Sequence, residues 1–322
     1  MIVHECNDKQ EWDSFVQAHT GHPLQLWGWG ELKAHHNWRA ARFFVKDGDT
    51  IVGGAQVLFR TIPGIHRTFA YIPRGPVGDV ANEAFLEALA IELKHSGAIG
   101  VVAEPDWEGD VVLPARWRKT DQTILIPQTL ILDLTQSEDE LLSDMAKKTR
   151  QYVHKSMKEE VVIRRVTEDS EVAACLEIYH QTAARAGFAI HDDSYYQDVL
   201  RLMGDSAPLY AAFKDDKPIA FVWLAASNTT AFELYGGMND VGQQLRINYA
   251  LKWFAITDCK RQGLRRYDLN GLLNDGISTF KRGFAHHENT LIGTIERPLS
   301  PLYTGWTTLL PVAKKINRLL HR

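Results

Sequence analysis

The sequence predicts an α+β protein built from two similar domains, each with a mixed sheet. Its 322 residues exceed the ~100 to 200 that are usual for one domain. A β-hairpin, with two strands around an Asp-Gly turn at residues 44–53, recurs at residues 212–220. The elements that follow each hairpin also recur in the same order. These observations indicate an internal duplication, with a first domain at 1–150 and a second at 151–299.

A strand, a helix and another strand are expected after each hairpin. In the first domain these are a strand ending near Tyr71, a helix at 82–95 and a strand at 99–103; in the second they are a strand ending near Tyr235, a helix at 248–261 and a strand at 266–269. The two tyrosines are 164 positions apart, and Gly97 and Gly263 are 166 apart. This order is the central part of the acyltransferase fold called GNAT (Gcn5-related N-acetyltransferase), so each domain is predicted to be one GNAT-like unit.

The segment joining the domains is predicted to be a helix that begins at residue 138 and continues through Lys158. Ser137 and Glu140 have the spacing of a capping box, and acidic residues at the start favour the helix dipole. Nearly every later charge in it is positive, which suits either a solvated face or a phosphate-binding surface. The end of the chain, 300–322, is expected to complete the first domain. Its basic amphipathic run 309–322 either docks there or touches a membrane.

The composition of the chain argues against several classes of protein. The net charge of −4 argues against general coating of nucleic acid. Neither a signal peptide nor an apolar run near the ~20 residues of a membrane span is readable, so a cytoplasmic protein is expected. Three scattered cysteines and the adjacent pairs His35-His36 and His286-His287 lack the spacing of metal ligands, so no metal is expected.

Lys281 is the strongest candidate for a functional side chain. It lies between Phe280 and Phe284, just after a predicted strand that ends in an Asn-Gly turn at 270–271. A cation in this setting suits an anion or a developing oxyanion. The alternative is that the two phenylalanines are core residues at helical spacing and that Lys281 points to water.

The predicted loops do not suit coenzyme A. A GNAT unit that uses it needs free backbone N–H groups in a glycine-containing loop at a helix start. The stretch 241–248 has no glycine after Gly242, and in 73–79 Pro76 removes one donor. No cofactor is therefore expected.

Five segments resemble one family in order. Residues 24–33 resemble an LQSWEWGEFK start, 70–76 a YIPRGP strand end, and 129–150 a T-x-x-x-D-L to M-x-x-K-x-R crossover. The others are 235–237 with 248–251, and 267–271 with 280–284. Together they resemble the Fem family of aminoacyl-tRNA-dependent transferases (FemA, FemB, FemX and MurM type), which build peptidoglycan cross-bridges. The similarity covers nearly the whole chain.

The resemblance implies a double GNAT-like fold and transfer of an amino acid from aminoacyl-tRNA. The implied acceptor is the side-chain amine of the peptidoglycan stem peptide, on UDP-MurNAc-pentapeptide or lipid II. A monomer is expected, with peripheral contact to the inner face of the membrane. The alternatives are a CoA-dependent N-acyltransferase and a non-catalytic protein that binds tRNA or an envelope precursor.

Individual site residues follow from the same resemblance. Phe280 and Lys281 match the pair nearest the reacting carbonyl, while Lys33 matches a lysine on the acceptor's diphosphate. The other residues expected to bind substrate are Tyr71, Arg74, His191, Tyr195, Tyr235 and Arg246. His191 replaces an arginine of the family, and a neutral imidazole binds phosphate less well. The long coiled-coil arm of FemA-type members is missing, which places the chain nearest the armless FemX type.

The expected chemistry needs orientation, removal of one proton and relief of charge on a tetrahedral oxygen. Glu104 and Asp106, just past the strand at 99–103, are candidates for the base; the alternatives are that they cap the following turn, or that the amine loses its proton to substrate or water.

Overall fold

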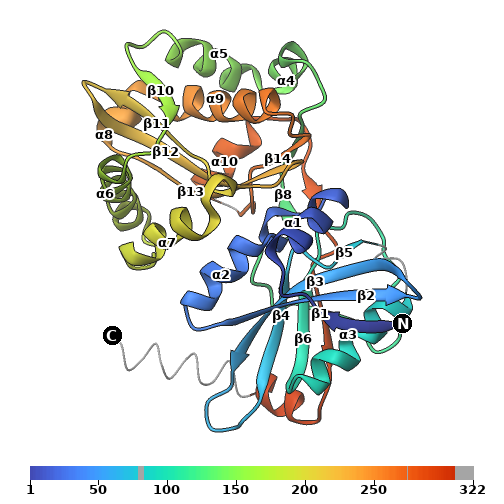
Figure 1. The fold of residues 1–322 in the computed structure, drawn as a ribbon. Helices are drawn as coiled ribbons and strands as arrows, with labels where there is room; N and C mark the ends of the chain where they lie inside the picture. Colours follow the sequence, from blue (N-terminus) through green and yellow to red (C-terminus); the bar gives the residue numbers. More distant parts are fainter. Residues whose placement is uncertain (79–82, 274, 309–322) are drawn as a thin grey trace.

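The computed structural model describes residues 1–78, 83–273 and 275–308 and contains two mixed sheets (Figure 1). In the first, the order is β1-β2-β3-β4-β6-β16-β7, with β5 beside β3. The bounds are β1 Ile2–Glu5, β2 Arg39–Asp47, β3 Thr50–Thr61, β4 Thr68–Pro73, β5 Val77–Gly78, β6 Ala98–Glu104, β7 Arg118–Thr120 and β16 Thr294–Pro298. Only β4 and β6 pair in parallel among these described strands.

The second sheet has the order β10-β11-β12-β13-β14-β9. Its strands are β9 Ile131–Asp133, β10 Val162–Arg165, β11 Leu209–Lys214, β12 Lys217–Ala226, β13 Thr230–Met238 and β14 Arg266–Asp268. Here β13 and β14 are the parallel pair. A short ladder joins β8 (Gln128–Thr129) to β15 (Asn289–Thr290). Each large sheet therefore repeats a hairpin, a strand and a parallel strand, as the sequence predicts.

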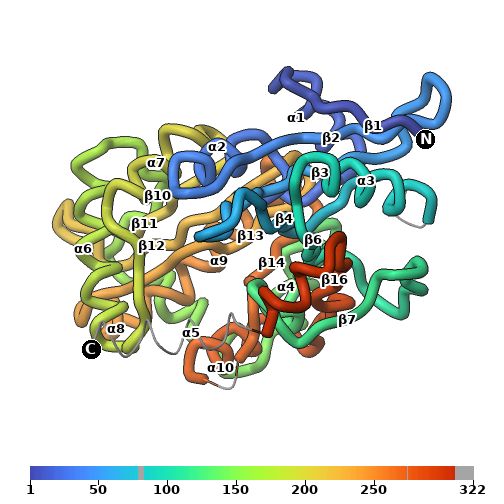
Figure 2. The backbone as a smooth tube through the Cα atoms, turned by 90° about the horizontal axis from the view of Figure 1, so that it is seen from below, coloured from blue at the N-terminus to red at the C-terminus, as the bar shows by residue number. Residues whose placement is uncertain are grey.

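Helices cover both sheets. On the first lie α1 (Lys9–Ala18), the short helix η1 (Pro23–Gln25), α2 (Trp27–His35) and α3 (Glu83–His95). With the second lie α4 (Glu138–Asp144), α5 (Lys147–Ser156), α6 (Asp169–Ala186), α7 (Asp193–Met203), the short helix η2 (Gly204–Ser206), α8 (Asp240–Leu245), α9 (Asn248–Arg261) and α10 (Gly276–Arg282). Figures 1 and 2 both show α2 beside α7, one of the places where the two halves meet.

The sheets exchange segments across residue 150. Strand β9 pairs with β14 in the second sheet, and β16 pairs with β6 in the first. The domain boundary at residue 150 stays a prediction. The strand pairing shows in addition that each sheet includes one strand from the other side of that boundary. The last described helical stretch, residues 302–308, packs Tyr303 against Ile62 and Ile99 of the first sheet. Residues 309–322, where the basic amphipathic helix is predicted, lie outside the described residues.

The joining helix is interrupted, contrary to the sequence prediction. Ser137 and Glu140 form the predicted capping box, but α4 ends before Met145, which is extended, and α5 begins at Lys147. The N–H of Ala146 donates instead to the carbonyl of Gly283, at 3.0 Å. Arg150 donates to carbonyl oxygens of Leu142, at 3.0 Å, and Met145, at 3.2 Å, which satisfies the end of α4. The break ties α5 to the end of α10.

Candidate functional site

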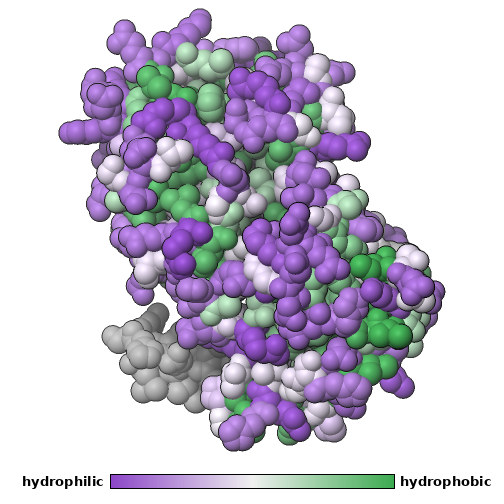
Figure 3. All heavy atoms as spheres, in the orientation of Figure 1, coloured by the Kyte–Doolittle hydropathy of each residue, from purple (hydrophilic) through white to green (hydrophobic). Residues whose placement is uncertain are grey.

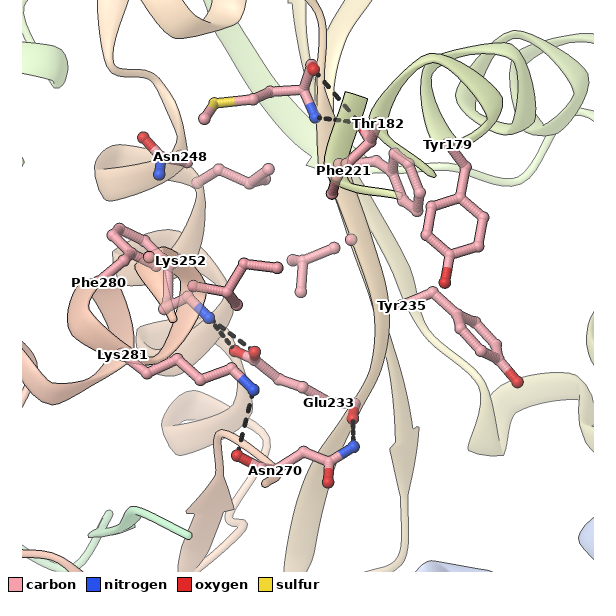
Figure 4. Close-up of a pocket in the computed structure, with 18 of the residues that line it drawn as sticks. Tyr179, Thr182, Phe221, Glu233, Tyr235, Asn248, Lys252, Asn270, Phe280 and Lys281 are labelled. Atoms are coloured by element: carbon pink, nitrogen blue, oxygen red, sulfur yellow. Dashed lines mark hydrogen bonds and ion pairs between the residues drawn. The ribbon is translucent and has the colours of Figure 1, made fainter. Parts of the chain in front are cut away.

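A pocket of about 750 Å³ opens between α6, β13, α9 and α10 (Figure 4). It exists because the two parallel strands of the second sheet separate. β13 pairs with β14 only from Thr230 to Phe232, although β13 continues to Met238. In the first sheet the corresponding strands stay paired as far as Pro73 and Glu104. Residues lining the pocket include Tyr179, Thr182, Glu233, Tyr235, Asn248, Lys252, Asn270, Phe280 and Lys281.

Lys281 lies in this pocket with its ammonium held by a backbone turn. Its Nζ donates to the carbonyl oxygens of Asn270, at 3.1 Å, and Gly271, at 3.2 Å. Asn270 has φ +61°, a left-handed conformation that asparagine tolerates better than most residues. Within the described chain Lys281 forms no ion pair. Burial lowers its pKa from the ordinary lysine value, and the nearby Glu233 carboxylate partly offsets this. The alternative in which Lys281 points to water is therefore wrong.

A buried ion pair lies beside Lys281. Lys252 Nζ donates to both carboxylate oxygens of Glu233, at 2.5 and 2.6 Å, and the two side chains are 8% and 10% exposed. Tyr267 also donates to Glu233, at 2.9 Å, and Asn270 Nδ2 donates to the Glu233 carbonyl, at 2.9 Å. Figure 4 shows both lysines pointing toward the strand that carries Glu233. Glu233 thus connects the ion pair to the turn that holds Lys281.

The sequence reasoning missed Glu233 and Lys252. A signal was available, because Glu233 is a single acid inside the apolar run 231–235 and Lys252 is a single base within the apolar stretch 250–256. Charges that a fold buries are nearly always paired. Two isolated opposite charges in apolar elements could therefore have been matched to each other.

A second cluster joins α2 to α7 and includes four predicted residues. Lys33 Nζ donates to the Tyr195 hydroxyl, at 2.7 Å, and the Tyr235 hydroxyl donates to the same oxygen, at 3.3 Å. The His191 ring stacks on Tyr195 with centroids 4.0 Å apart. Lys33 also lies 4.4 Å from the Trp29 ring centroid. Since Tyr235 lines the pocket while its hydroxyl points away from Lys281 in Figure 4, its ring connects the two sites.

The Lys33 ammonium has no carboxylate partner within the described residues. Burial lowers its pKa to about 8. Burial also lowers the pKa of His191, with smaller contributions from Lys33 and His36. A partly buried cation supported only by aromatic rings and a hydroxyl suits an anionic ligand.

Four other predicted residues are held in contacts between segments and do not line the pocket. Glu104 accepts from the Tyr71 hydroxyl, at 2.5 Å, and from the N–H groups of Ile124, at 2.6 Å, and Leu125, at 2.9 Å. Asp106 pairs with Arg266, at 2.7 Å. Buried Arg74 donates to the Ile126 carbonyl, at 3.3 Å.

Arg246, the remaining predicted residue, is exposed at the end of α8. Its φ is +53°, and its guanidinium carbon lies 4.1 Å from the Tyr152 ring centroid. It therefore lies outside the lining of the pocket, beside Asn248, which belongs to it.

No group of three or more His, Cys, Asp or Glu side chains in the described chain is arranged to hold a metal ion. The three cysteines are buried and unpaired. None of the described helices has the length and apolar character that crossing a bilayer requires.

Two family models match the chain. The FemAB family matches residues 8–107, and the acetyltransferase (GNAT) domain matches residues 143–282. Curated relatives include the lipid II:glycine glycyltransferases of Staphylococcus haemolyticus and Staphylococcus aureus. The first is 29% identical over 232 residues, 65% of this chain and 55% of its own length. The second is 29% identical over 209 residues, 59% of this chain and 49% of its own. The chain thus spans about half the length of these relatives.

Solved structures agree on the fold. The crystal structure of FemX superposes with a TM-score of 0.84 at 20% identity, covering 94% of this chain and 99% of that one. A tandem GNAT protein from the clavulanic acid pathway gives a TM-score of 0.55 at 11% identity, covering 93% and 99%. The predicted pair of GNAT-like units is confirmed. The FemAB match in the first half and the glycyltransferase relatives over most of the chain support the resemblance of this protein to the Fem family.

Proposed function

We propose that the chain is an aminoacyltransferase that moves an amino acid from aminoacyl-tRNA to the side-chain amine of a peptidoglycan stem peptide. The acceptor is UDP-MurNAc-pentapeptide or lipid II. The observation that carries the proposal is Lys281, a partly buried ammonium without an ion-pair partner in the described chain, in a pocket large enough for an aminoacyl ester. The names of the staphylococcal relatives support this class of acceptor.

The reaction breaks the ester bond between the amino acid and the tRNA ribose and forms an amide. The acceptor's amine nitrogen attacks the ester carbonyl carbon, and negative charge builds on the carbonyl oxygen and then on the departing ribose oxygen. Lys281 donates a hydrogen bond to that charge, a contribution of ~3 to 4 kcal/mol for one well-placed donor. Its burial favours proton donation because it lowers the ammonium pKa. Phe280, also in the pocket lining, packs against the reacting ester.

The proton lost by the amine passes to the leaving ribose oxygen in this mechanism. The two carboxylates considered as bases are already occupied, Glu104 by four donors and Asp106 by Arg266. A base must reach the proton it removes within hydrogen-bond distance. Their contacts favour a role in holding segments together.

Lys33, Tyr195, Tyr235 and His191 bind the diphosphate of the acceptor in this proposal. The acceptor lies across Tyr235, so that its anionic end meets Lys33 and its peptide end enters the pocket. Lipid II as acceptor places the reaction at the cytoplasmic face of the membrane, and the enzyme acts there as a monomer.

The start of α8 supports this donor over coenzyme A. The Asn239 side chain accepts from the Gly242 N–H, at 3.0 Å, so one donor that a pyrophosphate would use is occupied.

A transfer assay tests the proposal. The protein is incubated with a mixture of aminoacylated tRNAs and either acceptor, and the mass of the acceptor is then measured by mass spectrometry. We expect a gain equal to one or more amino-acid residues. The absence of any gain with both acceptors, together with stoichiometric binding of CoA by calorimetry, would contradict it.

A further inference from the structure

A continuous row of aromatic rings leads away from the pocket. It begins at Phe280, whose ring centroid lies 4.9 Å from that of Tyr249. Tyr249 lies 5.0 Å from Tyr152 of α5. The guanidinium of Arg246 lies over the outer end of the row, 4.1 Å from the Tyr152 centroid. Four side chains from four different elements thus form one stacking surface that ends beside Lys281.

The row is fixed relative to Lys281. The N–H of Ala146, just before α5, donates to the carbonyl of Gly283, just after α10. Gly283 also packs so closely on α5 that a β-carbon there would lie 2.2 Å from Thr149 Oγ1. α5 also packs against α9, and Figure 1 shows it beside that helix. Because α5 and α10 are joined directly, a strand bound along the row has a defined end at the pocket.

Positive charge surrounds this row although the chain as a whole is acidic, with a net charge of −4. α5 and the turn after it expose five basic side chains: Lys147, Lys148, His154, Lys155 and Lys158. Within the described residues, neither these side chains nor Arg246 is paired with a carboxylate. Lys148 Nζ lies 5.8 Å from the Tyr152 centroid. Hydrophilic side chains spread over this end of the molecule in Figure 3.

We propose that Tyr152, Arg246 and Tyr249, with the lysines of α5, bind the single-stranded 3′ end of an RNA and lead it to Lys281. This inference rests on the proposed function and adds the path by which the donor reaches the site. Unpaired bases stack on aromatic rings and on guanidinium planes, while lysines neutralise the phosphates between them. A double-stranded end does not offer unstacked bases, so the row binds only an overhang. An acidic peptide or an anionic membrane would use the charges but not the stacking surface.

The test is binding, without any transfer. A fluorescein-labelled RNA hairpin with four unpaired nucleotides at its 3′ end is compared with the same hairpin ending flush, by fluorescence anisotropy at several salt concentrations. We expect the overhang to bind at least tenfold more tightly. Tyr152→Ala removes most of this difference and leaves the flush hairpin unaffected, because base stacking on an aromatic ring is lost. Tyr152→Phe, which keeps the ring, binds like the wild type.

Two further variants distinguish the contribution of charge to RNA binding from that of base stacking. Lys148→Gln lowers the slope of log affinity against log salt by about 0.7, as expected for one phosphate contact with a single strand. Lys94→Gln, an exposed lysine of α3 on the first domain, leaves the slope unchanged. Circular dichroism and thermal unfolding confirm that each variant is folded.

The inference is overturned if Tyr152→Ala binds the overhang as the wild type does. It is also overturned if the RNA shows no preference for the overhang while vesicles containing phosphatidylglycerol bind in a manner that depends on Tyr152. The two proposals fail differently. Binding that depends on Tyr152, without aminoacyl transfer, contradicts only the proposed function. Transfer whose kcat/KM is unchanged in Tyr152→Ala contradicts only the RNA path.

Discussion

Lys252 donates to both carboxylate oxygens of Glu233, at 2.5 and 2.6 Å, inside the pocket that also holds Lys281. Burial lowers the pKa of the Lys281 ammonium; the Glu233 carboxylate raises it and the Lys252 ammonium lowers it. The backbone carbonyl of Glu233 also accepts a hydrogen bond from the side chain of Asn270, whose own carbonyl accepts one from Lys281. Glu233 therefore supports the charge of Lys281 through its carboxylate and the position of Lys281 through its backbone carbonyl.

Removing one member of this pair should destabilise the protein strongly. Lys252→Met leaves the Glu233 carboxylate buried without a cation, and we expect the free energy of unfolding in urea to fall by ~3 to 5 kcal/mol. The double variant Lys252→Met/Glu233→Gln removes the uncompensated charge and should recover most of that loss. A single variant that loses less than ~1 kcal/mol would contradict the buried pair.

Glu104→Gln should lower the stability of the protein and leave catalysis nearly unchanged. The carboxylate accepts from four donors, on Tyr71, Ile124, Leu125 and Thr294, and an amide offers them one acceptor oxygen. We expect a loss of ~2 kcal/mol in the free energy of unfolding, with kcat of the folded fraction changed less than threefold. A large fall in kcat at unchanged stability would instead identify Glu104 as a base.

Acceptor binding should weaken above about pH 8. Burial lowers the Lys33 pKa to about 8, so most of its ammonium is charged near pH 7 and the charge is lost as the pH rises through about 8. Calorimetric affinity for UDP-MurNAc-pentapeptide should therefore fall between pH 7.5 and 9.5. Lys33→Arg, which stays charged, should bind equally across this range.

The lowered pKa of Lys33 also makes the stability of the folded chain depend on pH. Lys33 has a lower pKa in the folded chain than the ~10.4 of an unperturbed lysine, so the unfolded chain binds more protons between about pH 8 and 10.4. The contribution of Lys33 to stability therefore rises across that window. A wild-type pH profile of unfolding that matches the Lys33→Met profile there would argue against a depressed pKa.

The sequence predicted the repeated elements well because local patterns specify them. The Asp-Gly turn specifies the first hairpin and the turn at Asp215 and Asp216 the second. The helix predicted at 248–261 has those bounds in the structure. Ser137 and Glu140 fixed the start of α4 through contacts within one turn. The break at Met145 could not be predicted in this way, because it depends on Gly283, a residue far along the chain.

The site was predicted unevenly for the same reason. Motifs matched to the family brought Lys33, Tyr195 and Tyr235 together, and the structure joins them by hydrogen bonds. Glu233 and Lys252 each stand out in the sequence as a single charge in an apolar element, but that they lie within hydrogen-bond distance depends on how β13 faces α9. The separation of β13 from β14, which creates the pocket, is likewise visible only in the strand register.

Single-turnover transfer by Lys281→Met tests most directly whether this ammonium stabilises the charge that forms on the ester. With saturating aminoacyl-tRNA and acceptor, we predict a rate at least ~100-fold below the wild type, the effect of losing one oxyanion donor. The melting temperature and the affinity for the acceptor should stay unchanged, since Lys281 bonds only to the carbonyls of Asn270 and Gly271 within the described chain. A transfer rate equal to that of the wild type would contradict the assignment.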